Sequence, residues 1–354
     1  MRRVNRISRE SCRQNAKRLL RFLKKTNKSI SPLLILTHDF PDPDALGSAF
    51  ALQYIVEHIF GISSKIVYRG DITRVENRAM VKKLKIHAQK LHPDDFSRYQ
   101  HIAIVDSQPE FGNNPFPKKR QATIVIDQHA PIQKPSARLS IINTGAGATS
   151  VILGQALLHL KIKIPPVLAT ALVYGILSDT LNLYRSNQEE VLRTYLQLLS
   201  FSDLRILSDI QNPTRSKSLY TTIMKGLRNA KVCKKLIVSH LGAIDSPELV
   251  SQVADFLIPY HRMAWCFCTG RHKDRLYVSL RIAKGRRNAG TILRSIFDNT
   301  DQAGGHGTIA GGSLKVKHHP KENHWIAAQD KLVARLIKRL RIPANGEFYH
   351  PFQG

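Results

Sequence analysis

Acidic and histidine side chains follow three separate apolar segments of this 354-residue chain, at residues 31–36, 102–105 and 123–126. The side chains that follow these segments are His38, Asp42, Asp44, Asp106, Asp127 and His129. Short β-branched runs bounded by polar residues are typical of buried parallel strands, and ligands bind beyond the carboxyl ends of such strands. We therefore expect these side chains to meet at one edge of a sheet.

This group has the composition of a site for hard divalent cations. Asp179, which follows a predicted helix at 166–177, adds a further carboxylate. So many negative charges in one crevice would repel one another unless cations neutralised them, and oxygen-rich ligands with histidine suit Mn²⁺ or Mg²⁺. Two such ions about 4 Å apart can activate a water molecule for in-line attack on phosphorus. The pattern predicts one or two ions per chain, although any single Asp could instead be a helix cap or turn former.

The order of predicted elements indicates an α/β fold. Strands and helices alternate over residues 1–205, which predicts a catalytic domain with a doubly wound, mainly parallel sheet. A linker is expected at 206–228. Residues 229–354 are expected to form a smaller α/β substrate-binding domain with a mixed sheet and a basic C-terminal helix at 325–340.

The charge balance favours a polyanionic partner. The chain carries 54 Lys and Arg against 26 Asp and Glu, a formal net charge of +28. Each phosphate that a basic protein neutralises releases counterions, so short single-stranded oligonucleotides or nucleotides are suitable partners. A generally basic source proteome would give the same balance.

Cysteine usage and hydropathy bear on location. The chain has 4 cysteines, and Cys266 and Cys268 are expected on opposite faces of a strand, which argues against a disulfide scaffold. No apolar stretch approaches a membrane span. We expect a cytoplasmic protein without stable membrane association, and the Arg-rich first thirty residues to form a surface helix, with an organelle-targeting segment as the alternative. A homodimer is left open.

The motifs resemble those of the DHH phosphoesterase family, in which RecJ-type nucleases, manganese pyrophosphatases, oligoribonuclease/pAp phosphatases and cyclic-dinucleotide phosphodiesterases share a catalytic domain. The matching motifs are His38-x-x-x-Asp42-x-Asp44-Ala45-x-Gly47-Ser48, Asp106, Asp127-Gln128-His129 and Ser178-Asp179-Thr180. Ser279-x-Arg281 and Gly304-Gly305-His306 resemble the glycine-rich substrate-binding domain of the oligoribonuclease branch.

The resemblance implies specific roles. It implies one metal ion held by His38, Asp42, Asp106 and Asp179, and a second held by Asp44, Asp106 and Asp179. The catalytic residues implied are Asp127, His129 and Asp179, with His129 facing the substrate phosphate. Ser279, Arg281, Gly304, Gly305 and His306 would contact substrate.

Gln128 departs from the family pattern, because it stands where the family has the histidine that completes the second metal site. An amide oxygen is a weaker ligand for manganese than imidazole, so a weakened or remodelled second site is predicted.

The function expected from these observations is metal-dependent hydrolysis of short oligoribonucleotides from the 3′ end, with adenosine 3′,5′-bisphosphate as a further substrate. One alternative is a cyclic-dinucleotide phosphodiesterase. Another is a non-catalytic nucleotide- or RNA-binding protein, if Gln128 disables the second metal site.

Overall fold

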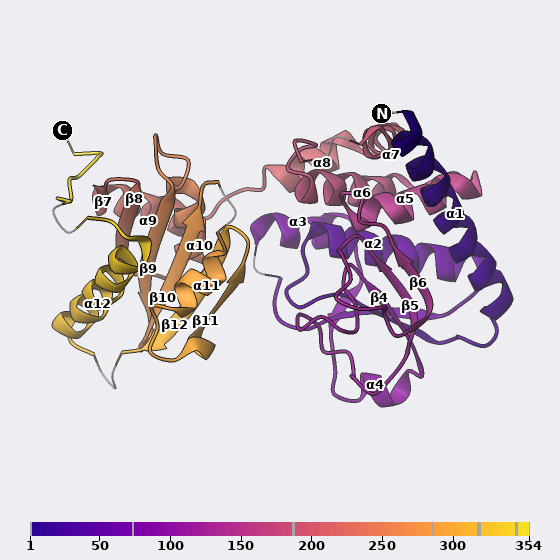
Figure 1. Ribbon diagram of the computed structural model, residues 1–354, viewed down its shortest axis with the longest axis horizontal. Helices are drawn as coiled ribbons and strands as arrows, with labels where there is room; N and C mark the ends of the chain where they lie inside the picture. The colour runs from indigo at the N-terminus through magenta and orange to yellow at the C-terminus, as the bar shows by residue number, and fades with distance from the viewer. Residues whose placement is uncertain are drawn as a thin grey trace. The chain divides into compact units, whose positions relative to one another are not determined.

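The computed structural model describes residues 2–72, 74–185, 188–284, 287–316, 320–343 and 346–353, without the side chains of residues 2–13 and of His306. The chain forms two compact units, Met1–Pro213 and Thr214–Gly354 (Figure 1). The segment expected as a linker contains most of helix α8 (Leu204–Gln211) and all of α9 (Lys217–Arg228). Asp203 and Ser216 cap these helices through hydrogen bonds from backbone N–H groups of the first turn.

The first unit contains the parallel sheet that the strand ends predicted. Its six strands lie in the order β3-β2-β1-β4-β5-β6 and every neighbouring pair is parallel. The strands are β1 (Leu33–Leu36), β2 (Ser64–Tyr68), β3 (Ala88–Lys90), β4 (His101–Val105), β5 (Ala122–Asp127) and β6 (Ala137–Ile142). The chain leaves β1 toward β2 and later returns to β4 on the other side of β1. In open parallel sheets, ligands bind at such a reversal, beyond the carboxyl ends of the neighbouring strands, here β1 and β4.

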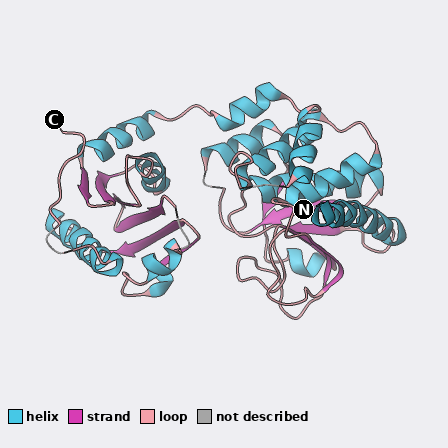
Figure 2. Cartoon of the chain, turned by 45° about the horizontal axis from the view of Figure 1, so that its top comes forward, coloured by secondary structure: helices cyan, strands magenta, loops and turns pink. Residues whose placement is uncertain are grey.

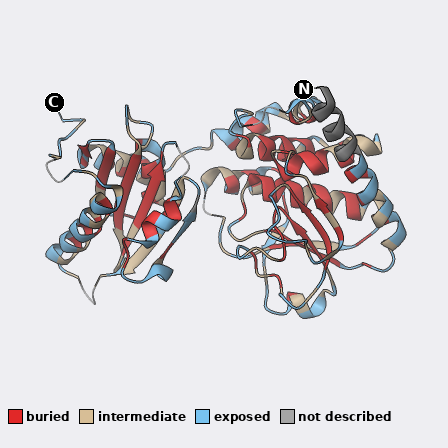
Figure 3. Cartoon of the chain, in the orientation of Figure 1, coloured by how far each residue is buried: buried red, intermediate tan, exposed pale blue. Residues whose placement is uncertain are grey.

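Helices cover one face of this sheet more fully than the other. The larger core contains residues of the sheet and of helices that include α2, α5 and α6. These helices lie on the same side of the sheet (Figure 1). The helices of the unit besides α8 are α1 (Arg2–Thr26), α2 (Pro43–Tyr54), which continues as a π-helical turn (Ile55–Ile59), α3 (Val75–Lys83), α4 (Asp95–Arg98), α5 (Thr149–Leu160), α6 (Pro166–Asp179) and α7 (Glu189–Leu199). A smaller core on the opposite face contains Leu34, Leu36 and Phe116. Both faces of the central strands are therefore buried (Figure 3), which explains their uninterrupted apolar sequences.

The second unit contains the predicted mixed sheet (Figure 2). Its order is β11-β12-β10-β9-β8-β7, and the β8–β9 pair is parallel whereas the other pairs are antiparallel. The strands are β7 (Ala230–Cys233), β8 (Leu236–Ala243), β9 (Trp265–His272), β10 (Arg275–Ile282), β11 (Ala303–His306) and β12 (Ile309–Lys315). The helices besides α9 are α10 (Glu248–Leu257), α11 (Ala289–Arg294), a 3₁₀ turn (Thr300–Gln302) and α12 (Glu322–Leu340). One core contains residues of α11 and α12, and the other contains residues of α9 and α10.

The two cysteines of β9 correct one expectation from the sequence. Cys266 and Cys268 are both buried in the core that contains residues of α9 and α10, with their Sγ atoms 3.7 Å apart. The expectation of opposite faces was wrong, because residues i and i+2 of a strand point to the same face. Both cysteines are free thiols in the structure.

Within the described ranges, no helix is both long enough and apolar enough to cross a membrane.

Candidate metal centre

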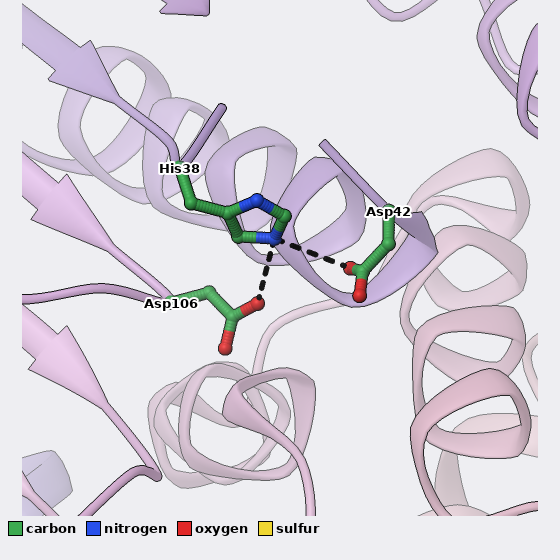
Figure 4. A group of neighbouring side chains, drawn as sticks. All are labelled: His38, Asp42 and Asp106. Carbon is green, nitrogen blue, oxygen red and sulfur yellow. Dashed lines mark ion pairs between the residues drawn. The ribbon is translucent and has the colours of Figure 1, made fainter. Parts of the chain in front are cut away.

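His38 lies just beyond the carboxyl end of β1, beside the end of β4. Its Nε2 atom is 3.5 Å from Asp106 Oδ2 and 3.8 Å from Asp42 Oδ1, so the ring points at both carboxylates (Figure 4). Its other ring nitrogen, Nδ1, is 2.8 Å from the carbonyl oxygen of Asp39. A proton on Nδ1 donated to that carbonyl leaves Nε2 as the atom that can bind a cation.

Asp42 and Asp44 lie where the chain enters α2. Asp42 is the N-cap, and its Oδ1 accepts a hydrogen bond of 3.0 Å from the N–H of Ala45. Asp44 is fully buried, and its two carboxylate oxygens accept 2.7 Å hydrogen bonds from the N–H groups of Thr149 and Ser150 in the first turn of α5. Two helix N-termini thus hold the loop carboxylates, because the N–H groups there lack partners within the helix.

Asp106 contacts side chains from several parts of the site. It follows β4 with a positive φ of 58°, a sparsely populated conformation that persists where the surrounding structure imposes it. Its N–H donates to the carbonyl of Ile126 in β5. Its Oδ2 faces His38, while its Oδ1 accepts from the Thr149 hydroxyl at 2.8 Å and lies 3.7 Å from His129 Nδ1. One carboxylate thus contacts side chains from three parts of the chain.

Asp127 and His129 form a second pair at the end of β5. His129 Nδ1 is 2.8 Å from Asp127 Oδ1, and the Gln108 side-chain amide donates to Asp127 Oδ2 at 2.7 Å and to the His129 carbonyl at 3.0 Å. Gln108 was missed in the sequence, although its position two residues after Asp106 at a strand end is a signal that could have identified it. Its fully buried amide positions both members of the pair.

Gln128 contacts Asp179, the last residue of α6. The Nε2 group of Gln128 donates a hydrogen bond to Asp179 Oδ2. Gln128 and the predicted metal ligand Asp179 are therefore in direct contact. The amide nitrogen faces the carboxylate in this arrangement, and a nitrogen that carries two protons cannot bind a cation.

The predicted residues of the first unit thus lie close together. The structure also brings together two groups of three donors whose ligand atoms lie within 4.8 Å of one another, His38–Asp42–Asp106 and Asp106–Asp127–His129. Asp106 belongs to both groups. This sharing is consistent with two adjacent cation positions.

Burial and mutual repulsion disfavour ionisation of several carboxyl groups in the site. Burial, followed by the charges of Asp106, Asp179 and Asp42, holds the pKa of Asp44 well above its ordinary value. Burial, followed by Asp42 and Asp106, raises the pKa of Asp179 to about 6, although the bond from Gln128 opposes this rise. Like charges in a low-dielectric crevice disfavour further ionisation.

The two histidines respond in the opposite direction. Burial disfavours protonation of His38, but its contacts with Asp106 and Asp42 outweigh burial and hold its pKa well above its ordinary value. The hydrogen bond to Asp127 is the largest cause that raises the pKa of His129 to about 9. In the absence of a cation, protons thus supply part of the positive charge that the site lacks. A set of carboxylate oxygens with two imidazoles fits a manganese or magnesium ion by donor type.

Close helix packing sets the position of Asp44 relative to Asp179. A Cβ atom on Gly175 of α6 would lie 2.4 Å from Ser150 Oγ and 3.1 Å from both Asp44 Cα and the Pro43 carbonyl oxygen. The absence of a side chain at Gly175 therefore allows α6 to approach the backbone of the Asp42–Asp44 loop.

The predicted substrate-binding residues of the second unit lie on and beside its sheet. Arg281 is buried at the end of β10, where its Nε donates to Asp255 Oδ1 at 2.5 Å and its Nη1 donates to Ser279 Oγ at 2.7 Å. Gly304 and Gly305 are exposed in the edge strand β11. The side chain of His306 lies outside the described residues. In this arrangement the Arg281 guanidinium is engaged with protein partners, and substrate contact by these residues stays a prediction.

Comparison with known proteins gives relatives of limited coverage. The chain matches no protein-family model. It is 33% identical to an uncharacterized protein of Methanocaldococcus jannaschii over 305 residues, which are 86% of this chain and 62% of that protein. It is 26% identical to a probable manganese-dependent inorganic pyrophosphatase of Streptococcus pyogenes over 165 residues, 43% of this chain and 49% of the relative. The matched segments thus span about half to three-fifths of these relatives' lengths.

A solved structure shows the same fold over nearly the whole chain. The crystal structure of an exopolyphosphatase-related protein from Bacteroides fragilis matches with a TM-score of 0.65 and 16% identity, covering 92% of this chain and 98% of that one. The chain therefore has the α/β fold of this exopolyphosphatase-related protein. In this chain, His38, Asp106 and Asp127 lie at the carboxyl ends of parallel strands.

Proposed function

We propose that the chain is a metal-dependent phosphoesterase that hydrolyses short oligoribonucleotides from the 3′ end. The observation that carries this proposal is the convergence of carboxylates and imidazoles around Asp106, at the reversal point of a parallel sheet. Similarity to a probable manganese-dependent pyrophosphatase and the resemblance of the motifs to DHH phosphoesterases support it. Adenosine 3′,5′-bisphosphate is included as a second substrate.

The side chains of the crevice have distinct tasks in this proposal. His38, Asp42, Asp106 and Asp179 would hold a divalent cation, with Asp44 and Asp127 beside them. Such a cation supplies Lewis-acid polarisation of a phosphoryl oxygen and favours deprotonation of water. Thr149 and Gln108 fix the carboxylates of Asp106 and Asp127 by hydrogen bonds, so neither carboxylate must reorganise during the reaction.

His129 would contact the substrate phosphate in this proposal. Its side chain is half exposed at the rim of the crevice, whereas the adjacent Asp127 is fully buried and orients its ring. A protonated imidazole held in this way can donate a hydrogen bond to a phosphoryl oxygen from Nε2. The net charge of +28 supports a polyanionic substrate, because long-range attraction raises the local concentration of phosphate chains.

One contact favours a second candidate function. The hydrogen bond from Gln128 to Asp179 engages a predicted metal ligand. If this bond persists in the presence of manganese, the crevice would hold fewer cations and would bind nucleotides without hydrolysing them. Binding without turnover is therefore the competing proposal.

The decisive experiment follows hydrolysis of a 5′-labelled RNA trimer by the full chain, with manganese and after chelation. We expect manganese-dependent shortening that leaves the label on the dimer first, since cleavage starts at the 3′ end. Asp106→Asn should abolish the reaction because Asp106 contacts both donor groups. Asp71→Asn is the matched control, because Asp71 is exposed and pairs with Lys90.

The outcomes separate the candidates. No turnover by folded protein that demonstrably binds manganese would refute the oligoribonuclease proposal. Hydrolysis of a cyclic dinucleotide alone under the same conditions would assign the crevice to that substrate class. Nucleotide binding with no hydrolysis of any phosphoester would support the binding protein.

A further inference from the structure

Phe40 is an exposed aromatic ring inside the loop of the metal centre. It lies two residues after His38 and two before Asp42, and the residue is 62% exposed. Among the exposed phenylalanines of the described residues, the next is Phe256 at 51%. The free energy of a large apolar ring falls when the ring leaves water. An exposed ring in the loop between His38 and Asp42 is therefore available to an apolar surface of a ligand.

The backbone holds Phe40 in a fixed position. The N–H of Phe40 donates to the carbonyl of Arg69 at 2.9 Å, and its φ of 55° is a left-handed backbone conformation. The preceding Asp39 is also anchored, because its N–H donates to the Asn113 carbonyl at 2.7 Å and its carboxylate accepts from Arg69 Nε at 2.8 Å. The ring is thus exposed on an anchored loop.

One side of the ring rests on a glycine. A Cβ atom on Gly70 would lie 2.6 Å from Phe40 Cδ1 and 2.7 Å from Cε1. Gly70 also has a φ of 88°, a conformation that side chains rarely adopt. The ring therefore lies against the backbone of Gly70 on this side, while the residue as a whole stays exposed.

We infer that Phe40 is the platform on which a nucleobase of the substrate stacks while the adjacent phosphate enters the crevice. This inference rests on the proposed phosphoesterase function and specifies its substrate class as nucleotides, as opposed to inorganic phosphate chains. Bases stack on aromatic side chains without strong sequence preference, because every base has a π-face. Inorganic polyphosphates have no planar apolar group and gain nothing from such a ring. Phe40 is thus a specificity-determining residue whose position between two predicted ligands couples base recognition to the metal centre.

A fluorescence titration tests the inference without requiring turnover. Phe40→Trp places an exposed indole at the platform, whereas the two native tryptophans, Trp265 and Trp325, are buried in the second unit. With manganese present, adenosine 5′-monophosphate should quench this indole in a saturable way, and ribose 5-phosphate should not. Equal responses to the two ligands, or no response to adenosine 5′-monophosphate, would overturn the inference.

A kinetic comparison tests the same residue in the proposed reaction. The normal RNA trimer is compared with one whose 3′-terminal nucleotide lacks its base. We expect the native chain to have a KM about tenfold lower for the normal trimer. A stacked base that contributes about 1.4 kcal/mol to binding changes the affinity tenfold. Phe40→Ala should abolish this preference, and Leu196→Ala, a substitution of an exposed side chain on α7, should retain it.

These outcomes are distinguishable from failure of the proposed function. If the native chain hydrolyses no RNA, the phosphoesterase proposal fails, and the titration of Phe40→Trp still decides whether a base stacks there. If RNA is hydrolysed and Phe40→Ala retains the full preference for the normal trimer, the platform is refuted while the reaction stands.

Discussion

Replacing Gly175 by alanine should disturb the candidate metal centre, because it should push helix α6 away from the start of α2. The new Cβ atom would lie 2.4 Å from Ser150 Oγ and 3.1 Å from both Asp44 Cα and the Pro43 carbonyl oxygen. The serine hydroxyl can rotate away, but the two backbone atoms can separate only if α6 moves from the Asp42–Asp44 loop. Asp179 lies four residues further along α6, so this movement would separate Asp179 from the other carboxylates.

The magnitude follows from two opposing effects. Overpacking of a filled interior costs about 3 kcal/mol at the upper end of its usual range, which is appropriate where backbone atoms are the obstacle. Alanine regains about 1 kcal/mol of helix propensity relative to glycine. The free energy of unfolding of the first unit should therefore fall by about 2 kcal/mol.

Gly154→Ala is the matched control in a neighbouring helix. Gly154 is buried in α5, and its new Cβ would meet only side-chain atoms, of which Leu198 Cδ1 at 2.7 Å is the nearest. That methyl group can shift, so the helix-propensity gain should offset most of the cost. The two variants thus share the chemical change and differ in whether backbone must move.

Urea unfolding followed by hydrogen exchange of peptides from α2 and α6 gives the stability difference, and isothermal titration with manganese gives the affinity. We expect Gly175→Ala to lose stability and manganese affinity, and Gly154→Ala to change neither appreciably. The packing argument is refuted if both variants have the same stability, or if Gly175→Ala binds manganese as tightly as the native chain.

Two further predictions concern one residue each. Gln128→His should raise manganese affinity by roughly tenfold in the same titration. The reason is that imidazole replaces an amide whose nitrogen faces Asp179. A lower affinity in this variant would mean that the glutamine oxygen is the better ligand. Burial lowers the pKa of His240 in the second unit to about 4, so the unfolded chain binds more protons between pH 6.5 and pH 4, and stability should fall as pH falls through this window. From pH 7 to pH 5 the free energy of unfolding of the second unit should fall by about 2 kcal/mol, measured by tryptophan fluorescence during urea unfolding. His240→Gln should remove this loss. An unchanged pH dependence in that variant would contradict the assignment to His240.

The parallel sheet could be predicted because its strands and turns have local signals. The apolar segments before His38, Asp106 and Asp127 became β1, β4 and β5, and these strands are neighbours, which brings their ends together. Burial on both faces gives such strands uninterrupted apolar sequences that are readable without knowledge of the fold. The order of the strands is set by tertiary packing and could not be read from the local pattern.

Elements with weaker local signals were missed. α8 lies in the segment expected as a linker, although Asp203 as a cap and Leu207 and Ile210 on its buried face are a helical signal. β11 and β12 contain Gly304, Gly305 and other glycines, which are depleted in strands, so their pairing depends on β10 as a neighbour.

The spacing of residues in the sequence did not indicate which side chains and backbone groups contact one another in the candidate metal centre. The motif identified Asp44, but only the structure shows that its oxygens meet the first turn of α5, more than a hundred residues later. Gln108 follows Asp106 by two residues, but this spacing alone does not show what its side chain contacts, and the same holds for Phe40 between His38 and Asp42. They are recognised by what they touch, a buried carboxylate in one case and the backbone of Gly70 in the other.

The sign of the charge differs between the metal centre and the chain as a whole. The chain has a net charge of +28, whereas the candidate metal centre gathers carboxylates, and burial together with their mutual repulsion raises the pKa of Asp44 and Asp179. A phosphate drawn toward the protein by the overall field would be repelled at the crevice itself. A divalent cation held by His38, Asp42 and Asp106 would reverse that local sign, because it would neutralise the carboxylates and attract the phosphate. Substrate binding and cation binding should therefore be cooperative, and nucleotide affinity should fall when manganese is removed, even in a variant that cannot hydrolyse its ligand.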